Sequence, residues 1–307
     1  MSQRRILVIR GGALGDFILT LPVLAALRRH FPSHALDILG GLRPAALALA
    51  AGLADDVSAL DSPALAGFFA PGGFWPETTT AFFARFELIV SYLSDPERIF
   101  QSNISRCTQA RFIAGPHRPD PSPGLHAVQA LLRPLETLGI RGADPRPRLI
   151  LPAPPQRPVD PPLAVHPGSG GERKNWPEAK WAAFLKRLAA QTAWNLLLIG
   201  GEAEGGRCRR LAAPLPPGRA RLAENLPLVE LARLMQCCAA YIGHDSGVTH
   251  LAAALDLPGW VLWGPSDEAI WRPVSDRMRL LRAERGLGRL PVQTVLREVQ
   301  RRPPSCP

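Results

Sequence analysis

The chain has 307 residues, of which 46% are hydrophobic and 20% are charged. This composition excludes an intrinsically disordered chain, and the length suffices for two domains of ordinary size, each with its own core. The chain holds no run of about 18 uncharged apolar residues, so no transmembrane helix is expected. The apolar stretch at the N-terminus is too short for a secretory signal, so we expect a cytoplasmic protein.

The charge balance is basic. Thirty-six Lys and Arg against 26 Asp and Glu give a net charge of +10, which favours anionic partners such as nucleic acid, acidic lipid surfaces or phosphorylated small molecules. The basic residues are scattered and no basic stretch is interleaved with aromatic residues, which argues against nucleic acid as a partner. Only three of them are lysines (Lys174, Lys180 and Lys186), which draws attention to Lys174. The five cysteines form no CxxC pair and have no His at metal-site spacing, so we expect neither zinc nor a structural disulfide.

The chain begins with a strand pattern. Residues 4–10 read RRILVIR, which is typical of a parallel strand buried on both faces. A glycine-rich turn at 11–16 and a helical pattern at 17–32 follow, which together make half of a doubly wound or nucleotide-binding unit. The turn is not GxGxxG, so no dinucleotide cofactor is implied. Asp16 either caps this helix or points into a cleft beyond the carboxyl end of the strand, and the pattern leaves both interpretations open.

The rest of the first half continues to alternate strands and helices. Short apolar runs predict strands at 35–40, 56–60, 86–93 and 110–115, and helical spacing occurs at 44–53 and 124–138. Residues 62–80, rich in Pro, Gly and Phe, predict a loop or a partly ordered helix that could cover a substrate site. Three arginines, Arg98, Arg106 and Arg111, are candidates to meet an anionic acceptor, although solvated surface arginines are commoner.

A proline-rich connector divides the chain. Residues 142–162 contain eight prolines, which indicates a domain boundary. We expect an N-terminal domain at 1–150, a linker at 151–162, a second domain at 163–287, and a C-terminal helix and tail at 288–307. The second half repeats the first pattern. A strand running into a glycine-rich loop is predicted over 163–171, further strands at 194–201, 219–225 and 259–264, and helices from Pro177 and over 226–239. With about three to four strand–loop–helix units in each half, we predict an α/β protein of two doubly wound domains facing one cleft.

The stretch Ala239–Leu257 carries the strongest local signal. An apolar strand is broken by Asp245, Ser246 and Gly247, and an Ala- and Leu-rich helix follows. The unpaired N–H groups and the dipole at such a helix start suit a phosphate or pyrophosphate. The alternative is that Asp245 or Ser246 only caps the helix.

Three stretches together resemble the lipopolysaccharide heptosyltransferases of glycosyltransferase family 9. They are RGGALGDFILTLP (10–22), HPGSGGERKNWP (166–177) and GHDSGVTHL (243–251), in the family's order and at about its spacing. The resemblance implies the GT-B fold, in which two Rossmann-like domains face a central cleft.

The resemblance also implies roles for single residues. Asp16 falls on the family's general base and Lys174 on its donor-phosphate lysine, with a solvent-exposed lysine at the helix entry as the alternative for Lys174. Glu202 falls on an acid that holds the donor ribose, unless it is a solvated loop residue. His250 is either a donor-site residue or a satisfied core histidine. The remaining donor-site positions are Ser169, Gly170, Gly171, Asp245, Ser246, Gly247 and Val248, with backbone contacts to phosphate expected at the two glycines of the 169–171 loop.

The implied activity is inverting, metal-independent transfer of a heptose from ADP-heptose to an anionic glycolipid of the lipopolysaccharide core. ADP-sugar is then a co-substrate and no cofactor is needed. The acceptor would bring the protein to the inner face of the plasma membrane as a peripheral protein, which suits its positive charge. Two alternatives stay open: a GT-B enzyme with another nucleotide sugar or acceptor, and a non-catalytic nucleotide-sugar-binding protein.

Overall fold

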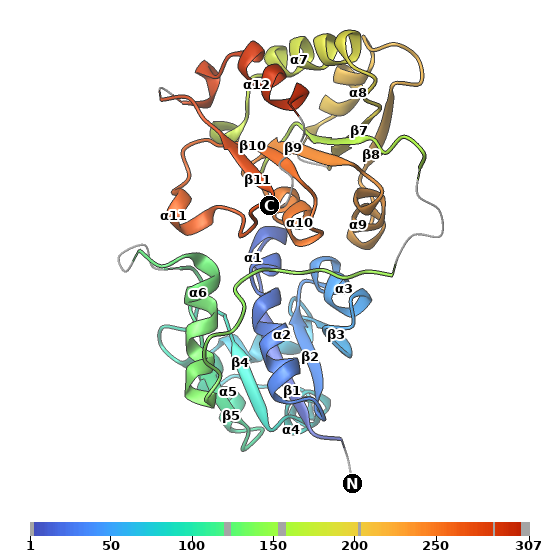
Figure 1. Ribbon diagram of the computed structural model, residues 1–307. Helices are drawn as coiled ribbons and strands as arrows, with labels where there is room; N and C mark the ends of the chain where they lie inside the picture. The colour runs from blue at the N-terminus through green and yellow to red at the C-terminus, as the bar shows by residue number, and fades with distance from the viewer. Residues whose placement is uncertain (1–2, 120–123, 153–157, 202–203, 285, 302–307) are drawn as a thin grey trace. The chain divides into compact units, whose positions relative to one another are not determined.

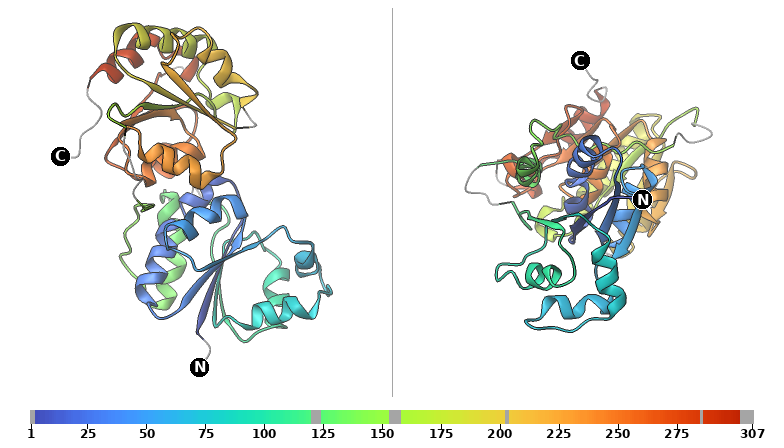
Figure 2. Two further views of the ribbon diagram at one scale, coloured as in Figure 1. Left: turned by 90° about the vertical axis from the view of Figure 1, so that its right-hand side faces the viewer. Right: turned by 90° about the horizontal axis from the view of Figure 1, so that it is seen from below.

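The computed structural model describes residues 3–119, 124–152, 158–201, 204–284 and 286–301. The chain divides into two compact units, Met1–Leu149 and Ile150–Pro307, and each is described by itself. In both units a parallel β-sheet carries helices on its two faces (Figure 1 and Figure 2). The predicted α/β, doubly wound architecture is confirmed.

The first unit is built on a five-stranded sheet in the order β3-β2-β1-β4-β5. Its strands are β1 (Arg5–Arg10), β2 (Ala35–Gly40), β3 (Asp56–Ala59), β4 (Leu88–Ser91) and β5 (Arg111–Ala114). The central strand β1 pairs with β2 on one side and β4 on the other, which is why its apolar residues are buried on both faces. The chain therefore winds outward in both directions from β1, and the crevice at the carboxyl ends of β1 and β4 is the switch point of this sheet.

The helices of the first unit are shorter than the sequence pattern suggests. They are α1 (Leu14–Ile18), α2 (Leu21–His30), α3 (Leu42–Ala50), η1 (Pro63–Phe69), α4 (Glu77–Ala84), α5 (Ile99–Ser105), α6 (Ala127–Leu132) and η2 (Arg133–Leu138), where η denotes a 3₁₀ helix. The single helix predicted over 17–32 is wrong, because Pro22 has no N–H to donate to Ile18 and the chain restarts as α2. The helix α5 was not predicted, since only seven residues form it.

The helices η1, α4 and α5 form a layer on one side of the first sheet, drawn in cyan and teal in Figure 2. Phe68, Phe83 and Phe100 are buried in it and pack on the sheet residues Leu7 and Ile89. The side-chain amide of buried Asn103 donates to the carbonyls of a loop at the end of η1. Of the two alternatives predicted for 62–80, a loop or a partly ordered helix, the structure has the partly helical one.

The second unit has a six-stranded sheet in the order β11-β10-β9-β6-β7-β8. Its strands are β6 (Leu163–His166), β7 (Leu196–Gly200), β8 (Ala220–Glu224), β9 (Ala240–His244), β10 (Gly259–Leu262) and β11 (Met278–Leu281). The chain winds one way from β6 through β7 to β8 and the other way through β9, β10 and β11. The switch point of this sheet therefore lies at the carboxyl ends of β6 and β9.

The helices of the second unit are η3 (Glu172–Lys174), α7 (Glu178–Gln191), α8 (Arg207–Ala212), α9 (Leu228–Gln236), α10 (Gly247–Ala254), α11 (Glu268–Trp271), η5 (Leu287–Arg289) and α12 (Val292–Gln300). The elements α8, α11 and β11 were missed by the sequence analysis. Each is six residues or shorter, and β11 is an edge strand whose apolar residues alternate with a charged one. The five strands of the first sheet were all predicted, whereas the second sheet has one strand, β11, beyond those predicted. Among the described residues, no helix has the length and apolar character needed to cross a membrane.

Candidate functional site

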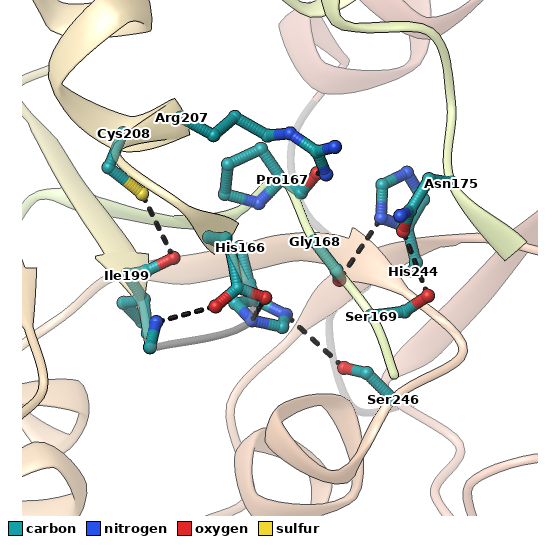
Figure 3. A network of polar contacts seen from close by, with 12 residues as sticks. His166, Pro167, Gly168, Ser169, Asn175, Ile199, Arg207, Cys208, His244 and Ser246 are labelled. Atoms are coloured by element: carbon teal, nitrogen blue, oxygen red, sulfur yellow. Dashed lines mark hydrogen bonds and ion pairs between the residues drawn. The ribbon is translucent and has the colours of Figure 1, made fainter. Parts of the chain in front are cut away.

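Two loops meet at the switch point of the second sheet. The strands β6 and β9 are parallel neighbours that pair His166 with Gly243 near their carboxyl ends. The loop 167–174 leaves β6 and the turn 245–247 leaves β9, so both lie where open α/β sheets bind ligands. Figure 3 shows the polar contacts that hold this region together.

Lys174 and Asp245 form an ion pair across these two loops. The Lys174 Nζ lies 2.6 Å from Asp245 Oδ2, and Ser266 donates a hydrogen bond from its hydroxyl to the same oxygen. The Asp245 side chain is 6% exposed, whereas that of Lys174 is 39% exposed. The Asp245 carboxylate is buried and accepts two hydrogen bonds, whereas the Lys174 ammonium is partly open to solvent. Asp245 therefore holds Lys174 in place while the positive charge of Lys174 stays available to an anion.

Ser246 is the N-cap of α10. Its hydroxyl accepts the N–H of Thr249 at 3.4 Å, so this serine caps the helix, and its additional contact with a donor stays a prediction. The first N–H groups of α10 belong to Gly247 and Val248, which are both half-buried, and such groups have no partner inside the helix. His250, one turn further on, is buried. The helix start therefore offers two N–H donors and a positive dipole end beside the Lys174–Asp245 pair.

The loop after β6 combines one bonded serine with two open glycines. The Ser169 hydroxyl lies 2.8 Å from Asn175 Oδ1 and 3.0 Å from the Gly171 carbonyl. A Cβ placed on Gly170 or Gly171 would meet no heavy atom within 4 Å. The protein's own packing therefore does not require glycine at these two positions, and the space beside their backbone is free.

His244 locks this loop to β9. Its Nε2 accepts the Trp176 backbone N–H at 2.8 Å and the Trp181 indole N–H at 3.3 Å, while Nδ1 lies 3.2 Å from the Gly168 carbonyl. These partners require a neutral ring with the proton on Nδ1. The ring is fully buried, and this burial lowers the pKa of His244 to about 3. The sequence analysis did not select His244, although it stands directly before Asp245.

A second buried histidine, His166, joins the acid Glu204 to the helix cap. Its Nε2 is 3.5 Å from Glu204 Oε1 and its Nδ1 is 3.3 Å from the Ser246 hydroxyl. A dashed line in Figure 3 joins His166 to Ser246. The hydrogen bond from His166 holds the pKa of Glu204 below its usual value, although burial opposes it. The Glu204 carboxylate also fills the space where a Cβ on Gly168 would lie. The acid singled out from the sequence, Glu202, lies outside the described residues.

In the first unit, Asp16 lies at the switch point beside β1. It is in the first turn of α1, where its Oδ2 accepts the Ala13 backbone N–H at 3.0 Å. The side chain is 33% exposed, and its Oδ1 lies 3.6 Å from a guanidinium nitrogen of the buried Arg10. Asp16 thus stabilises its own turn and still presents part of its carboxylate to solvent.

The three candidate acceptor arginines are not gathered in one place. Arg98 precedes α5 and Arg106 follows it, so about 12 Å of helix axis separates them. Arg106 lies over the Trp75 ring, 4.6 Å from its centroid. Arg111 starts β5, at the amino edge of the sheet and opposite Asp16, and it donates to the Thr137 carbonyl at 2.6 Å.

Side chains suited to binding a metal do not cluster in the described part of the chain. No group of three or more His, Cys, Asp or Glu residues there could hold an ion. Independence from metal nevertheless stays a prediction.

The chain is similar to known proteins in sequence and in fold. Residues 146–293 match the family described as glycosyltransferase family 9 (heptosyltransferase). Lipopolysaccharide heptosyltransferase 1 of Pseudomonas aeruginosa is 38% identical over 95 residues, which cover 31% of this chain and 26% of that protein. The chain thus matches about a quarter of the length of that relative.

Two solved structures share the fold over nearly the whole chain. A family 9 glycosyltransferase from Veillonella parvula has a TM-score of 0.78 at 17% identity, covering 98% of this chain and 97% of its own. The E. coli heptosyltransferase WaaC, solved with ADP-2-deoxy-2-fluoro heptose, has a TM-score of 0.73 at 19% identity, covering 96% of this chain and 99% of its own. The predicted GT-B fold class is confirmed by these likenesses.

Proposed function

We propose that the chain is a glycosyltransferase that moves a heptose onto an acceptor of the lipopolysaccharide core, because residues 146–293 match the glycosyltransferase family 9 model. The family is described as heptosyltransferase, and the similar protein of Pseudomonas aeruginosa is a lipopolysaccharide heptosyltransferase. Both observations support the sugar and the acceptor class.

The donor in this proposal is ADP-heptose, bound in the second unit. Its diphosphate lies against Lys174 and the first N–H groups of α10, with the open backbone of Gly170 and Gly171 on the other side. Ser169, Asp245, Ser246, Val248 and His250 complete the proposed donor site, and Glu202 is proposed to hold the ribose. An ammonium and aligned N–H groups can stabilise the leaving diphosphate without a metal ion.

The base in this proposal is Asp16. Its carboxylate takes the proton of the acceptor hydroxyl while the hydroxyl oxygen attacks the anomeric carbon of the heptose. The bond from that carbon to the diphosphate breaks in the same step, and ADP leaves with the electron pair. A single in-line displacement inverts the anomeric configuration. The partly exposed carboxylate at a sheet switch point supports this role.

The acceptor in this proposal is an anionic glycolipid, which would bring the enzyme to the inner face of the membrane. Arg98 is the best placed of the three arginines, because it follows the carboxyl end of β4 and is exposed. Arg106 and Arg111 are already engaged with Trp75 and Thr137, and they remain weaker candidates.

The observation that carries the proposal is the Lys174–Asp245 pair at the start of α10. Calorimetric titration without metal, using ADP, UDP, GDP and CMP, tests it. We expect ADP to bind best and Lys174→Ala to weaken ADP about tenfold or more, since a charge-assisted contact is lost. Lys186→Ala is the matched control, because Lys186 is exposed on α7.

Other results would select the alternatives. If the protein prefers UDP or GDP, the proposed donor is wrong but the proposed donor site stands. ADP binding without heptose transfer to any Kdo–lipid A or inner-core acceptor would favour a non-catalytic binding protein. Equal ADP affinity in wild type and Lys174→Ala would refute the donor site.

A further inference from the structure

Arg10, the last residue of β1, carries a positive charge into the interior of the first unit, where it is 3% exposed. Burial lowers the pKa of Arg10, and the neighbouring Asp16 carboxylate opposes this by favouring the charged form. A buried guanidinium needs partners for its charge and its N–H groups. Arg10 donates to the His117 carbonyl at 3.0 Å and to the Asp16 carbonyl at 3.4 Å.

The Asp16 carboxylate is held from two directions. Its Oδ2 accepts the Ala13 N–H at 3.0 Å, and its Oδ1 lies 3.6 Å from Arg10. Gly12, with φ of 101°, lets the turn close around it, because a Cβ there would lie 2.8 Å from Oδ2. Two contacts on different oxygens fix both the position of the carboxylate and its rotation.

We propose that Arg10 is a positioning residue for Asp16, which holds the carboxylate aimed at the acceptor hydroxyl. The inference rests on the proposed role of Asp16 as the base. Arg10 is buried, so it acts on the reaction through Asp16. A base must lie within reach of the proton it takes, and Arg10 serves this need by fixing the carboxylate.

The planar fork of arginine suits this place better than lysine. One terminal nitrogen bonds the His117 carbonyl, on the segment after β5, and the other faces Asp16 on α1. Arg10 also lies over the Tyr92 ring, 5.9 Å from its centroid. A lysine ammonium would keep the charge, but it could not span the two segments with a fixed fork.

Two other titratable groups face the pair in the described structure. Tyr92 is fully buried, and burial raises its pKa, so its phenol stays neutral. Its hydroxyl donates to the Leu131 carbonyl. His117 offers Arg10 its backbone carbonyl, while its Nδ1 lies 3.4 Å from the Tyr92 carbonyl. The variant His117→Gln therefore keeps the carbonyl that Arg10 uses and removes the imidazole ring.

The test compares wild type with Arg10→Gln, Arg10→Lys, His117→Gln and Asp16→Asn. Heptose transfer from ADP-heptose to Kdo–lipid A gives kcat and KM for each variant. Calorimetry with ADP and denaturation curves monitor the donor site and the fold.

In Arg10→Gln we expect kcat to fall about 10- to 100-fold with ADP affinity unchanged, since a misplaced base slows only the chemical step. Arg10→Lys should also lose kcat, because its ammonium keeps the charge but cannot span the two segments. His117→Gln, which keeps the backbone carbonyl, should match wild type in both kcat and ADP affinity.

The inference is overturned if Asp16→Asn is inactive while Arg10→Gln keeps a kcat within twofold of wild type. It is also overturned if His117→Gln lowers kcat as much as Arg10→Gln does. If Asp16→Asn transfers heptose at the wild-type rate, the proposed base is wrong and the role of Arg10 falls with it. If Arg10→Gln does not fold, the folded Arg10→Lys decides, because wild-type kcat there would refute the need for the fork.

Discussion

Replacing His244 by asparagine should remove a pH-dependent part of the stability of the second unit. The ordinary pKa of 6.5 applies to the unfolded chain, whereas burial lowers the value in the folded protein to about 3. Between these two pH values the unfolded chain binds a proton that the folded chain does not. Stability from this group is therefore complete above pH 6.5 and falls as the pH falls toward 3.

The size of the effect follows from the two pKa values. Linkage gives a loss of about 2 kcal/mol of unfolding free energy between about pH 7.5 and pH 5 from this one ring. The asparagine variant has no such group, so its loss over the same range should be smaller by about that amount. At neutral pH it should be about 1–3 kcal/mol less stable than wild type, because the buried Trp176 N–H loses its acceptor.

Urea unfolding followed by tryptophan fluorescence measures this directly. Six of the seven tryptophans lie in Ile150–Pro307, the exception being Trp75, so the signal reports mainly on the second unit. His30→Asn, at an exposed position on α2, controls for the removal of a histidine as such. The reasoning is refuted if wild type and His244→Asn lose equal stability on acidification, or if His30→Asn changes the pH dependence as much.

Two further predictions concern glycines that face a carboxylate. Gly12→Ala should lower the rate of heptose transfer about 100-fold, because its Cβ displaces the Asp16 carboxylate. The control Gly139→Ala, also at positive φ (80°) but in open space, should only lower the free energy of unfolding by about 1 kcal/mol. Transfer rates and thermal melts of both variants check this, and equal losses of transfer would contradict it. Gly168→Ala should cost about 1–3 kcal/mol of unfolding free energy, because its Cβ needs space that a buried carboxylate occupies, and Gly170→Ala should change stability by less than about 0.5 kcal/mol. Urea denaturation separates the two, and similar values would show that the loop adapts to a side chain at either position.

Local patterns were enough to predict much of the fold. The apolar runs of β1 and β9 are long and uninterrupted, and each ends at glycines or a cap residue, so both the strands and the turns after them could be read directly. The α10 entry is likewise local, since Ser246 bonds a group three residues away. Short elements such as α8 and β11 could not be predicted, because fewer than two turns or alternations give no usable period.

The features of the site that could not be predicted depend on contacts between distant parts of the chain. Lys174 and Asp245 are 71 residues apart, so each was selected singly and their pairing became visible only in the folded unit. The roles of His244 and Arg10 depend on their burial. Burial of a polar residue is difficult to predict from a single sequence. The acceptor arginines were chosen by residue type and region, and the sheet then places Arg111 at its opposite edge.

The bond from Arg10 to the His117 carbonyl spans 107 residues of chain. During synthesis, β1 and the Asp16 turn emerge first, but the backbone group that anchors their buried arginine arrives only after β5 has been made. Parallel pairing of distant segments is slow to form, so this part of the first unit is completed late. In a nascent chain that ends before His117, the Arg10 guanidinium lacks the carbonyl that it bonds in the complete unit. Fragments shortened in this way should therefore be less stable than the number of sheet strands they contain suggests.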